Sequence, residues 1–254
     1  MALLVDGSWC NMDELQTYDG SATSVAAEEG IDLSVKMALS EAWITDKVDD
    51  FLHWESNCGQ GGSLQSGLSV SNAVIDDRLK RWHLTHTLAL LYRDASFSQV
   101  NDRFRKKWEA YETETVRYKD EYFNNGVPYV SSPVRKPAAP IVTVTAGNLT
   151  AAAYFIATTQ VDSLGNESAL SDVTSTQAAD GNGITVTATG LAAGNVWNIY
   201  AADSDGVMRR QNDVPLEAGV AWTIPDAGLV EGAVGGGGQA PTGRVKMRRI
   251  MPRG

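Results

Sequence analysis

The stretch SFSQVNDRFRKKWEAYETETVRYKDEYFNNGVP, residues 96–128, is the most strongly patterned part of the chain. Large side chains recur along it at steps of three, four or seven residues, with Thr115 in the one remaining slot: Val100, Phe104, Trp108, Tyr111, Tyr118 and Tyr122. This period places them along one edge of an α-helix. Ser96 with Gln99 matches a capping box, and Asn124-Asn125-Gly126 followed by Pro128 ends the helix. The pattern predicts one helix of roughly 40 Å whose stripe packs against a partner.

The residues before this stretch supply that partner. Apolar residues at helical spacing predict two further helices, over 31–54 and 71–95, and the middle of the second is apolar on nearly every side, as in a buried helix. Glycines and serines predict a loop over 55–69, and residues 1–30 are weakly patterned and predict mostly loop. Because short connections make neighbouring helices antiparallel, residues 1–127 are predicted to form a bundle of about three main helices.

The composition changes after the long helix. Pro128, Pro133, Pro137 and Pro140 predict a semi-rigid linker over residues 128–140. Beyond the linker, turn clusters rich in Gly, Asn and Asp separate predicted strands near 141–145, 151–162, 168–177, 184–189, 195–202, 207–213 and 220–224. These segments predict a seven-stranded antiparallel β-sandwich over residues 141–231, with Trp197 and Tyr200 in its core. The predicted fold class is therefore α + β with two domains.

The last residues differ from the rest in charge. The net charge is −10, yet residues 232–254 hold no acid and five bases: Arg244, Lys246, Arg248, Arg249 and Arg253. The run of four glycines at 235–238 predicts a flexible tether that releases a basic tail. An acidic body argues against broad nucleic-acid binding by phosphate neutralisation. The tail predicts docking to an acidic partner, and a solvated, disordered terminus is the alternative.

The sequence contains no membrane-length apolar run and no signal peptide, so we expect a protein that stays where it is synthesised. Two cysteines, Cys10 and Cys58, do not make a disulfide framework and are expected to be free thiols.

The candidates for catalysis or metal binding are few. His83 and His86 have a spacing that suits one metal ion, but their apolar surroundings favour histidines in a helical core. The segment Asp203-Ser204-Asp205-Gly206 begins like a calcium loop and lacks the closing Glu, which favours a hairpin turn. The sequence has no Gly-x-Ser-x-Gly, no phosphate-binding glycine loop and no convincing Ser, His and Asp set. It therefore predicts no enzyme, no metal site and no cofactor.

Two resemblances add to these inferences. The segments Tyr154-Phe155-Ile156-Ala157, VDSLGNES (161–168), Trp197-Asn198-Ile199-Tyr200 and Ile224-Pro225-Asp226 resemble a fibronectin type III or related immunoglobulin-like module of the kind inserted into bacteriophage structural proteins. The segments ALLYRDA (89–95) and VNDRFRKKWEAY (100–111) resemble head–tail connector (adaptor) proteins of tailed bacteriophages, over about residues 31–129.

The second resemblance implies a helical bundle that forms a twelve-fold ring beneath the portal, with a C-terminal segment that embraces the portal subunits. That segment corresponds here to residues 244–253, and its partner-binding residues are Arg244, Lys246, Met247, Arg248, Arg249, Ile250 and Arg253. The sandwich between bundle and tail departs from the simplest adaptors.

The leading hypothesis is a structural protein of the virion neck, made in the host cytoplasm. We expect a homo-oligomeric ring that binds the portal protein and a downstream neck or tail-completion protein, without membrane contact. Double-stranded DNA would pass through its lumen without specific binding, and the balanced charges of the long helix would set contacts between subunits. The alternative is a tail or baseplate module whose sandwich recognises a host polysaccharide or receptor, with Trp197 and Trp222 as the first candidates for an aromatic ligand face.

Overall fold

A computed structural model describes residues 1–7, 9–57, 67–98, 102–203 and 206–246. The fold class is α + β, and the chain divides into two compact units. The helical unit contains Gly7–Ser131 and Pro241–Gly254, and the sheet unit contains Met1–Asp6 and Ser132–Ala240. This division differs from the predicted contiguous domains because each unit combines two separate pieces of chain. The sheet unit interrupts the chain of the helical unit.

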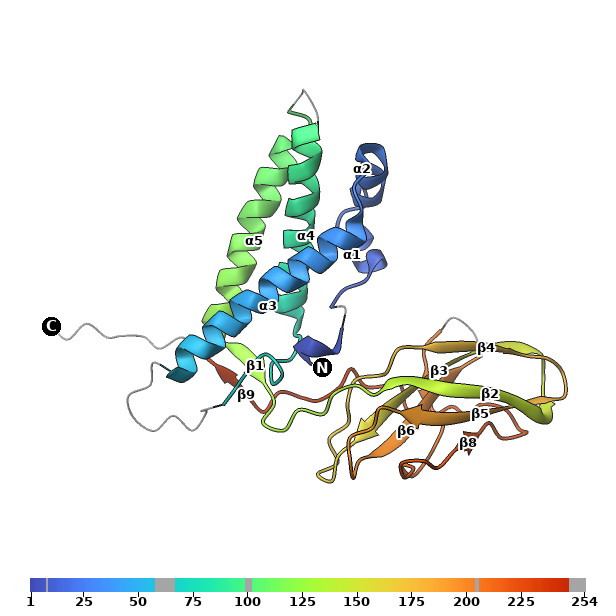
Figure 1. The fold of residues 1–254 in the computed structure, drawn as a ribbon. Helices are drawn as coiled ribbons and strands as arrows, with labels where there is room; N and C mark the ends of the chain where they lie inside the picture. The colour runs from blue at the N-terminus through green and yellow to red at the C-terminus, as the bar shows by residue number, and fades with distance from the viewer. Residues whose placement is uncertain (8, 58–66, 99–101, 204–205, 247–254) are drawn as a thin grey trace. The chain divides into compact units, whose positions relative to one another are not determined.

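The helical unit is built around three long helices (Figure 1). They are α3 (Leu33–Asn57), α4 (Asp77–Ser98) and α5 (Arg105–Asn125), and α4 lies beside α5 as the predicted hairpin. Two short helices, α1 (Met12–Tyr18) and α2 (Ala22–Glu29), lie in the region predicted as mostly loop. The sequence carries a local signal for α1, since Asn11 and Glu14 form a reciprocal capping box.

The long helix is shorter than predicted. Ser96 belongs to α4, and α5 begins at Arg105 after Phe104, whose side chain makes no capping hydrogen bond. Gln99 and Val100 lie outside the described residues. The predicted end is confirmed, because Gly126 follows the helix with a φ of 90° and donates its N–H to the Tyr122 carbonyl at 3.1 Å. A helix of 21 residues is about 30 Å long.

The core of the helical unit confirms the prediction that α4 is the buried helix. Trp82, Leu88, Leu91, Tyr92 and Ala95 are fully buried on it. Of the predicted stripe on α5, Phe104, Thr115 and Tyr122 are buried, whereas Trp108, Tyr111 and Tyr118 are half-buried.

An aromatic cluster joins the three long helices at one end of the unit. The Phe51 ring of α3 lies 4.8 Å from Phe123 of α5, which in turn contacts Trp82 of α4 at 5.5 Å. Such pairs add to the stability gained from apolar burial.

The sheet unit contains two antiparallel sheets. One has the order β2-β5-β8 and the other β4-β3-β6-β7. Their strands are β2 (Ala138–Leu149), β3 (Ala152–Val161), β4 (Thr174–Ala178), β5 (Asn182–Thr189), β6 (Val196–Ala202), β7 (Arg209–Arg210) and β8 (Trp222–Thr223). Inward positions alternate along the strands, as in the register Val142↔Val186↔Trp222. One hydrophobic core gathers side chains from both sheets, including Tyr154, Ile156, Ile184, Val186, Trp197 and Ile199.

The predicted linker takes part in both units. Pro128 lies in β1 (Val127–Tyr129), Val130 and Val134 are buried, and β2 begins at Ala138. Its prolines therefore occupy ordered backbone. The Lys136 N–H donates to the Asp6 carboxylate at 3.2 Å, which ties this segment to the N-terminal residues of the sheet unit.

Two of the four glycines at 235–238, Gly235 and Gly238, pack closely within the sheet unit, in contrast to the predicted tether, and Gly236 and Gly237 are exposed. The Gly235 N–H donates to the Met208 carbonyl at 3.2 Å. Gly238 has a φ of 100°, and a Cβ there would lie 2.3 Å from the Met1 carbonyl oxygen. Next to it, the Gln239 side chain accepts from Val134 and donates to Ser132. These glycines allow close approach of backbone segments.

Candidate functional site

The predicted docking segment begins in a β-strand of the helical unit. Strand β9 (Gly243–Val245) pairs antiparallel with β1, with Val127 opposite Val245 and Tyr129 opposite Gly243. Val245 is buried, so the first residues of the predicted basic tail contribute to the core of the helical unit. Gly126 permits this pairing, since a Cβ there would lie 2.8 Å from the Val245 carbonyl oxygen.

Arg244 connects β9 to the C-terminal end of α5 and to the start of α4. Its guanidinium donates to the Gly126 carbonyl at the end of α5 (3.0 Å) and to the Asp76 carboxylate (3.2 Å). Asp76 is buried, and its other oxygen accepts the Leu79 N–H at 3.0 Å at the start of α4. A buried carboxylate needs such partners, because desolvation penalises an isolated charge. Arg244 is thus engaged inside the helical unit, with its side chain still 30% exposed.

The other residues of the predicted docking segment come after Arg244 in the chain. Lys246 is exposed beside the end of α5. Met247, Arg248, Arg249, Ile250 and Arg253 lie outside the described residues. The structure therefore places the first residues of the predicted docking segment, 244–246, at the end of α5.

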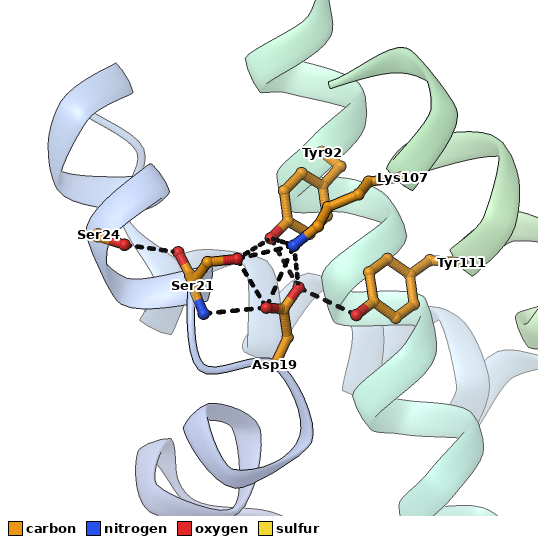
Figure 2. Close-up of polar contacts among 6 residues, drawn as sticks. All are labelled: Asp19, Ser21, Ser24, Tyr92, Lys107 and Tyr111. Atoms are coloured by element: carbon orange, nitrogen blue, oxygen red, sulfur yellow. Dashed lines mark hydrogen bonds and ion pairs between the residues drawn. The ribbon is translucent and has the colours of Figure 1, made fainter. Parts of the chain in front are cut away.

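A second polar site, not expected from the sequence, lies between α1, α4 and α5 (Figure 2). Asp19, which follows α1, accepts hydrogen bonds from the hydroxyls of Tyr92 (2.7 Å) and Tyr111 (2.9 Å) and from Lys107 Nζ (3.0 Å). Ser21 donates both its N–H (2.9 Å) and its hydroxyl (2.7 Å) to the same carboxylate. We call these five residues the Asp19 cluster.

The hydrogen bonds of the Asp19 cluster stabilise the charged forms of Asp19 and Lys107. Burial would raise the pKa of Asp19, but the hydrogen bonds from Tyr92, Ser21 and Lys107 outweigh it and lower that pKa. Burial likewise works against the charge of Lys107, and its bonds to Tyr92 and Asp19 still raise the pKa of the ammonium. The pKa of Tyr111 is raised by burial and by its bond to Asp19. Asp19 therefore stays a carboxylate and Lys107 a cation over the physiological pH range.

This arrangement does not favour catalysis. A nucleophile requires a neighbouring base with a free lone pair, and the nearest amine to the Ser21 hydroxyl, Lys107 Nζ at 2.7 Å, is protonated. Each oxygen of Asp19 already accepts three hydrogen bonds. The cluster instead fastens the turn between α1 and α2 to the α4–α5 hairpin. One partial signal for the cluster was present in the sequence, because Lys107 and Tyr111 lie four residues apart on one helix.

The two histidines lie in the helical core, as predicted. His83 is fully buried with Nε2 3.1 Å from the Met37 carbonyl, and burial lowers its pKa. His86 contacts the Ser40 hydroxyl at 2.9 Å and stacks on Trp43 at 4.5 Å, and burial lowers its pKa to about 4. Both are neutral at physiological pH. No group of three or more metal-ligating His, Cys, Asp or Glu residues occurs in the described part of the chain.

The remaining candidates are the two cysteines and the predicted turn at 203–206. Cys10 is a buried free thiol whose pKa burial raises to about 12, and Cys58 lies outside the described residues. So do Ser204 and Asp205 of the predicted turn. Among the helices that the structure describes, none combines the length and apolarity needed to cross a membrane.

The aromatic candidates for ligand recognition point into the sheet unit. Trp197 is fully buried and donates its indole N–H to the Glu217 carbonyl at 3.1 Å, and Trp222 is half-buried against the core. Within the described part of the sheet unit, no aromatic side chain is among the large exposed apolar ones. Burial excludes Trp197 from a ligand face, because its ring fills the core between the sheets, and Trp222 exposes only part of its ring.

Comparison of the chain with protein-family profiles and with curated proteins found no match in either.

Proposed function

We propose that the chain is a non-enzymatic structural protein of a tailed-bacteriophage virion, a head-to-tail adaptor in the neck. In this proposal identical subunits form a ring, twelve-fold by resemblance, that binds the portal protein. A downstream neck or tail-completion protein binds the other side of the ring. The protein is made in the host cytoplasm and functions in the virion.

The observation that carries this proposal is the anchored start of the basic segment. Pairing of β9 with β1 and the Arg244–Asp76 contact hold the chain at the end of α5 up to Lys246. The next residues, 247–253, supply Met247, Arg248, Arg249, Ile250 and Arg253. Arg and Met are enriched at protein interfaces, and a rigid origin lowers the entropy cost of binding. This favours a docking segment over a terminus that is solvated without function.

We infer that the sheet unit is an immunoglobulin-like sandwich. In such domains strands C′, C, F and G form one sheet, and B, E and D are neighbours in the other. The order β4-β3-β6-β7 agrees with C′-C-F-G, and the pair β2-β5 agrees with B-E. Strand β8 lies beside β5 where D would lie, but it follows the strand equivalent to G in the chain and so departs from this topology. In the described chain no strand pairs with the other edge of β2, where strand A would lie. The unit lies between β1 and β9 in the chain, as expected of a module inserted into a helical bundle.

The charge distribution also supports a neck ring. The chain has a net charge of −10, and the helices α1 to α5 carry about half of its acids. A negative lumen repels the DNA backbone, so DNA would pass without adhering.

The test is assembly with the portal protein. Native mass spectrometry of the purified chain mixed with portal rings is expected to show a shared complex that weakens as salt rises, because exposed charge contacts are screened. Reversing two tail charges (Arg248→Glu with Arg249→Glu) is expected to abolish the complex. Reversing two exposed bases of the helices (Arg81→Glu with Arg117→Glu) serves as the matched control and should preserve it. Absence of any shared complex for the unaltered chain would contradict the proposal.

A further inference from the structure

One edge of α3 carries an unusual stripe, most of it exposed, although Trp43 also stacks on His86 of α4. Val35, Leu39, Trp43, Asp46, Asp50 and Trp54 follow one another at steps of four or three, which aligns them along one helix edge. Val35 is 49% exposed, Leu39 53%, Trp43 38% and Trp54 66%. We call these six residues the α3 stripe. Exposed apolar groups gathered in this way mark interaction sites, and Trp is the residue most enriched in binding hot spots.

The α3 stripe contains two acids, Asp46 and Asp50. The end of the α4–α5 hairpin, where α4 ends and α5 begins, carries more bases than acids. Phe97, near the end of α4, is 74% exposed, and its ring lies 5.7 Å from Trp108 of α5. Around this pair lie four exposed bases and two exposed acids: Arg93, Arg103, Arg105 and Lys106, with Asp102 and Glu109. We call this surface the hairpin tip. The ion pairs within it, such as Arg105 with Glu109 at 3.0 Å, are exposed and therefore weak.

The acidic, C-terminal half of the α3 stripe and the hairpin tip lie at opposite ends of the helical unit, whereas Lys36, beside Val35, forms an ion pair with Asp94 of α4. The contact between Phe51 and Phe123 places the acidic half of α3 at the C-terminal end of α5. The hairpin tip lies at the N-terminal end of α5, about 30 Å away along a helix of 21 residues. Figure 1 shows the same arrangement, with α3 crossing the hairpin and ending far from its tip. The tip of a chain therefore cannot reach the acidic half of its own α3 stripe.

We propose that the α3 stripe of one copy binds the hairpin tip of the next copy. Phe97 of one subunit packs against the exposed tryptophans of its neighbour, and Arg93 and Lys106 face Asp46 and Asp50. Because the two surfaces differ, the contact is heterologous and repeats from copy to copy, which generates a ring when the rotation closes. The inference rests on the proposed ring function and specifies its subunit contact.

The experiment uses charge reversal on each surface. Sedimentation velocity of the full chain without portal is expected to show self-association. A stripe variant (Asp46→Lys with Asp50→Lys) and a tip variant (Arg93→Glu with Lys106→Glu) should each lose it, since like charges then meet. An equimolar mixture of the two variants should regain it, because every reversed stripe meets a reversed tip and every normal stripe a normal tip. An unrelated interface gives no such recovery.

Two controls keep the test independent of folding. Each variant must retain the circular dichroism of the unaltered chain, and reversal of two exposed acids of the sheet unit (Asp213→Lys with Asp226→Lys) should leave association unchanged. Truncating Trp54 to Ala should weaken association roughly thirtyfold, as for a hot-spot tryptophan.

The outcomes separate this contact from the proposed function. An unaltered chain that stays monomeric at the highest attainable concentration, or folded variants whose mixture does not associate, would overturn the contact. Portal binding by such a chain would still support the adaptor proposal. Self-association with the predicted recovery but without portal binding would support the contact and overturn the adaptor.

Discussion

A chain that ends at Ala240 is expected to lose about 5 kcal/mol of the unfolding free energy of its helical unit, a large part of the roughly 5–15 kcal/mol typical of a domain. The truncation removes Val245 from the core, which costs about 2 kcal/mol of apolar burial. It also removes Arg244 and leaves the buried Asp76 carboxylate without its closest cation, at a further cost of about 3 kcal/mol. Urea unfolding followed by far-ultraviolet circular dichroism measures the loss.

A chain that ends at Lys246 is the matched control for this truncation. It keeps β9 and Arg244 and lacks residues 247–254, so its unfolding free energy should equal that of the full chain. Arg244→Ala in the full chain should account for about 3 kcal/mol of the effect by itself. If the chain ending at Ala240 unfolded at the same urea concentration as the full chain, the role assigned to β9 would be refuted.

The difference between the predicted and observed structure of residues 232–246 shows which features can be predicted from the sequence. Helices and most strands depend on a local period, and the predicted ranges contain the cores of α3, α4, α5 and β2 to β6. The pairing of Val127 with Val245 joins residues far apart in the chain, and no local pattern encodes it. The glycines before it indicated flexibility, whereas Gly238 serves close approach to Met1. Composition alone does not separate these two uses of glycine.

The predicted start of the long helix was wrong for a related reason. A helical period continues through 96–104 in the sequence, although the chain reverses there and brings the rings of Phe97 and Trp108 into contact. Periodicity reports which side chains are apolar and does not report where a helix is interrupted. Phe104, the residue before α5, makes no side-chain capping hydrogen bond, so the usual sequence signal for a helix start is missing.

The Asp19 cluster could not be predicted because it depends on three helices at once. Asp19 lies in a weakly patterned region, Tyr92 in an apolar run, and Lys107 and Tyr111 on the long helix. The aromatic period correctly placed Tyr111 beside the core, where it stacks on Tyr92 at 5.6 Å. The hydroxyl groups of both rings needed an acceptor, and only the folded chain reveals which carboxylate supplies it.

Replacing Asp19 by Ala is expected to lower the unfolding free energy by about 3 kcal/mol. The substitution removes the 2.7 Å acceptor of the buried Tyr92 hydroxyl, which keeps only the Ser21 hydroxyl at 3.1 Å, and the acceptor of Tyr111, and each loss costs about 1–2 kcal/mol. Lys107 is about half exposed and recovers hydration, so its loss adds little. Tyr111→Phe is the milder comparison and should cost about 1 kcal/mol. A double-mutant cycle between Asp19→Ala and Tyr111→Phe should give a coupling energy of the same size.

The same cluster predicts a dependence on pH that Asp19→Asn should abolish. The pKa of Asp19 is lower in the folded chain than its ordinary value of about 3.9, so folding favours the carboxylate. Its contribution to the unfolding free energy is complete above about pH 4 and is lost as the pH falls through the folded pKa. Asn cannot titrate, so the difference in unfolding free energy between the unaltered chain and Asp19→Asn should be constant from about pH 7 to about pH 5 and shrink in more acidic solution. Urea titrations at several pH values measure this difference. A gap that stayed constant into strong acid would mean that the carboxylate of Asp19 is not what holds the two tyrosines and Lys107 together.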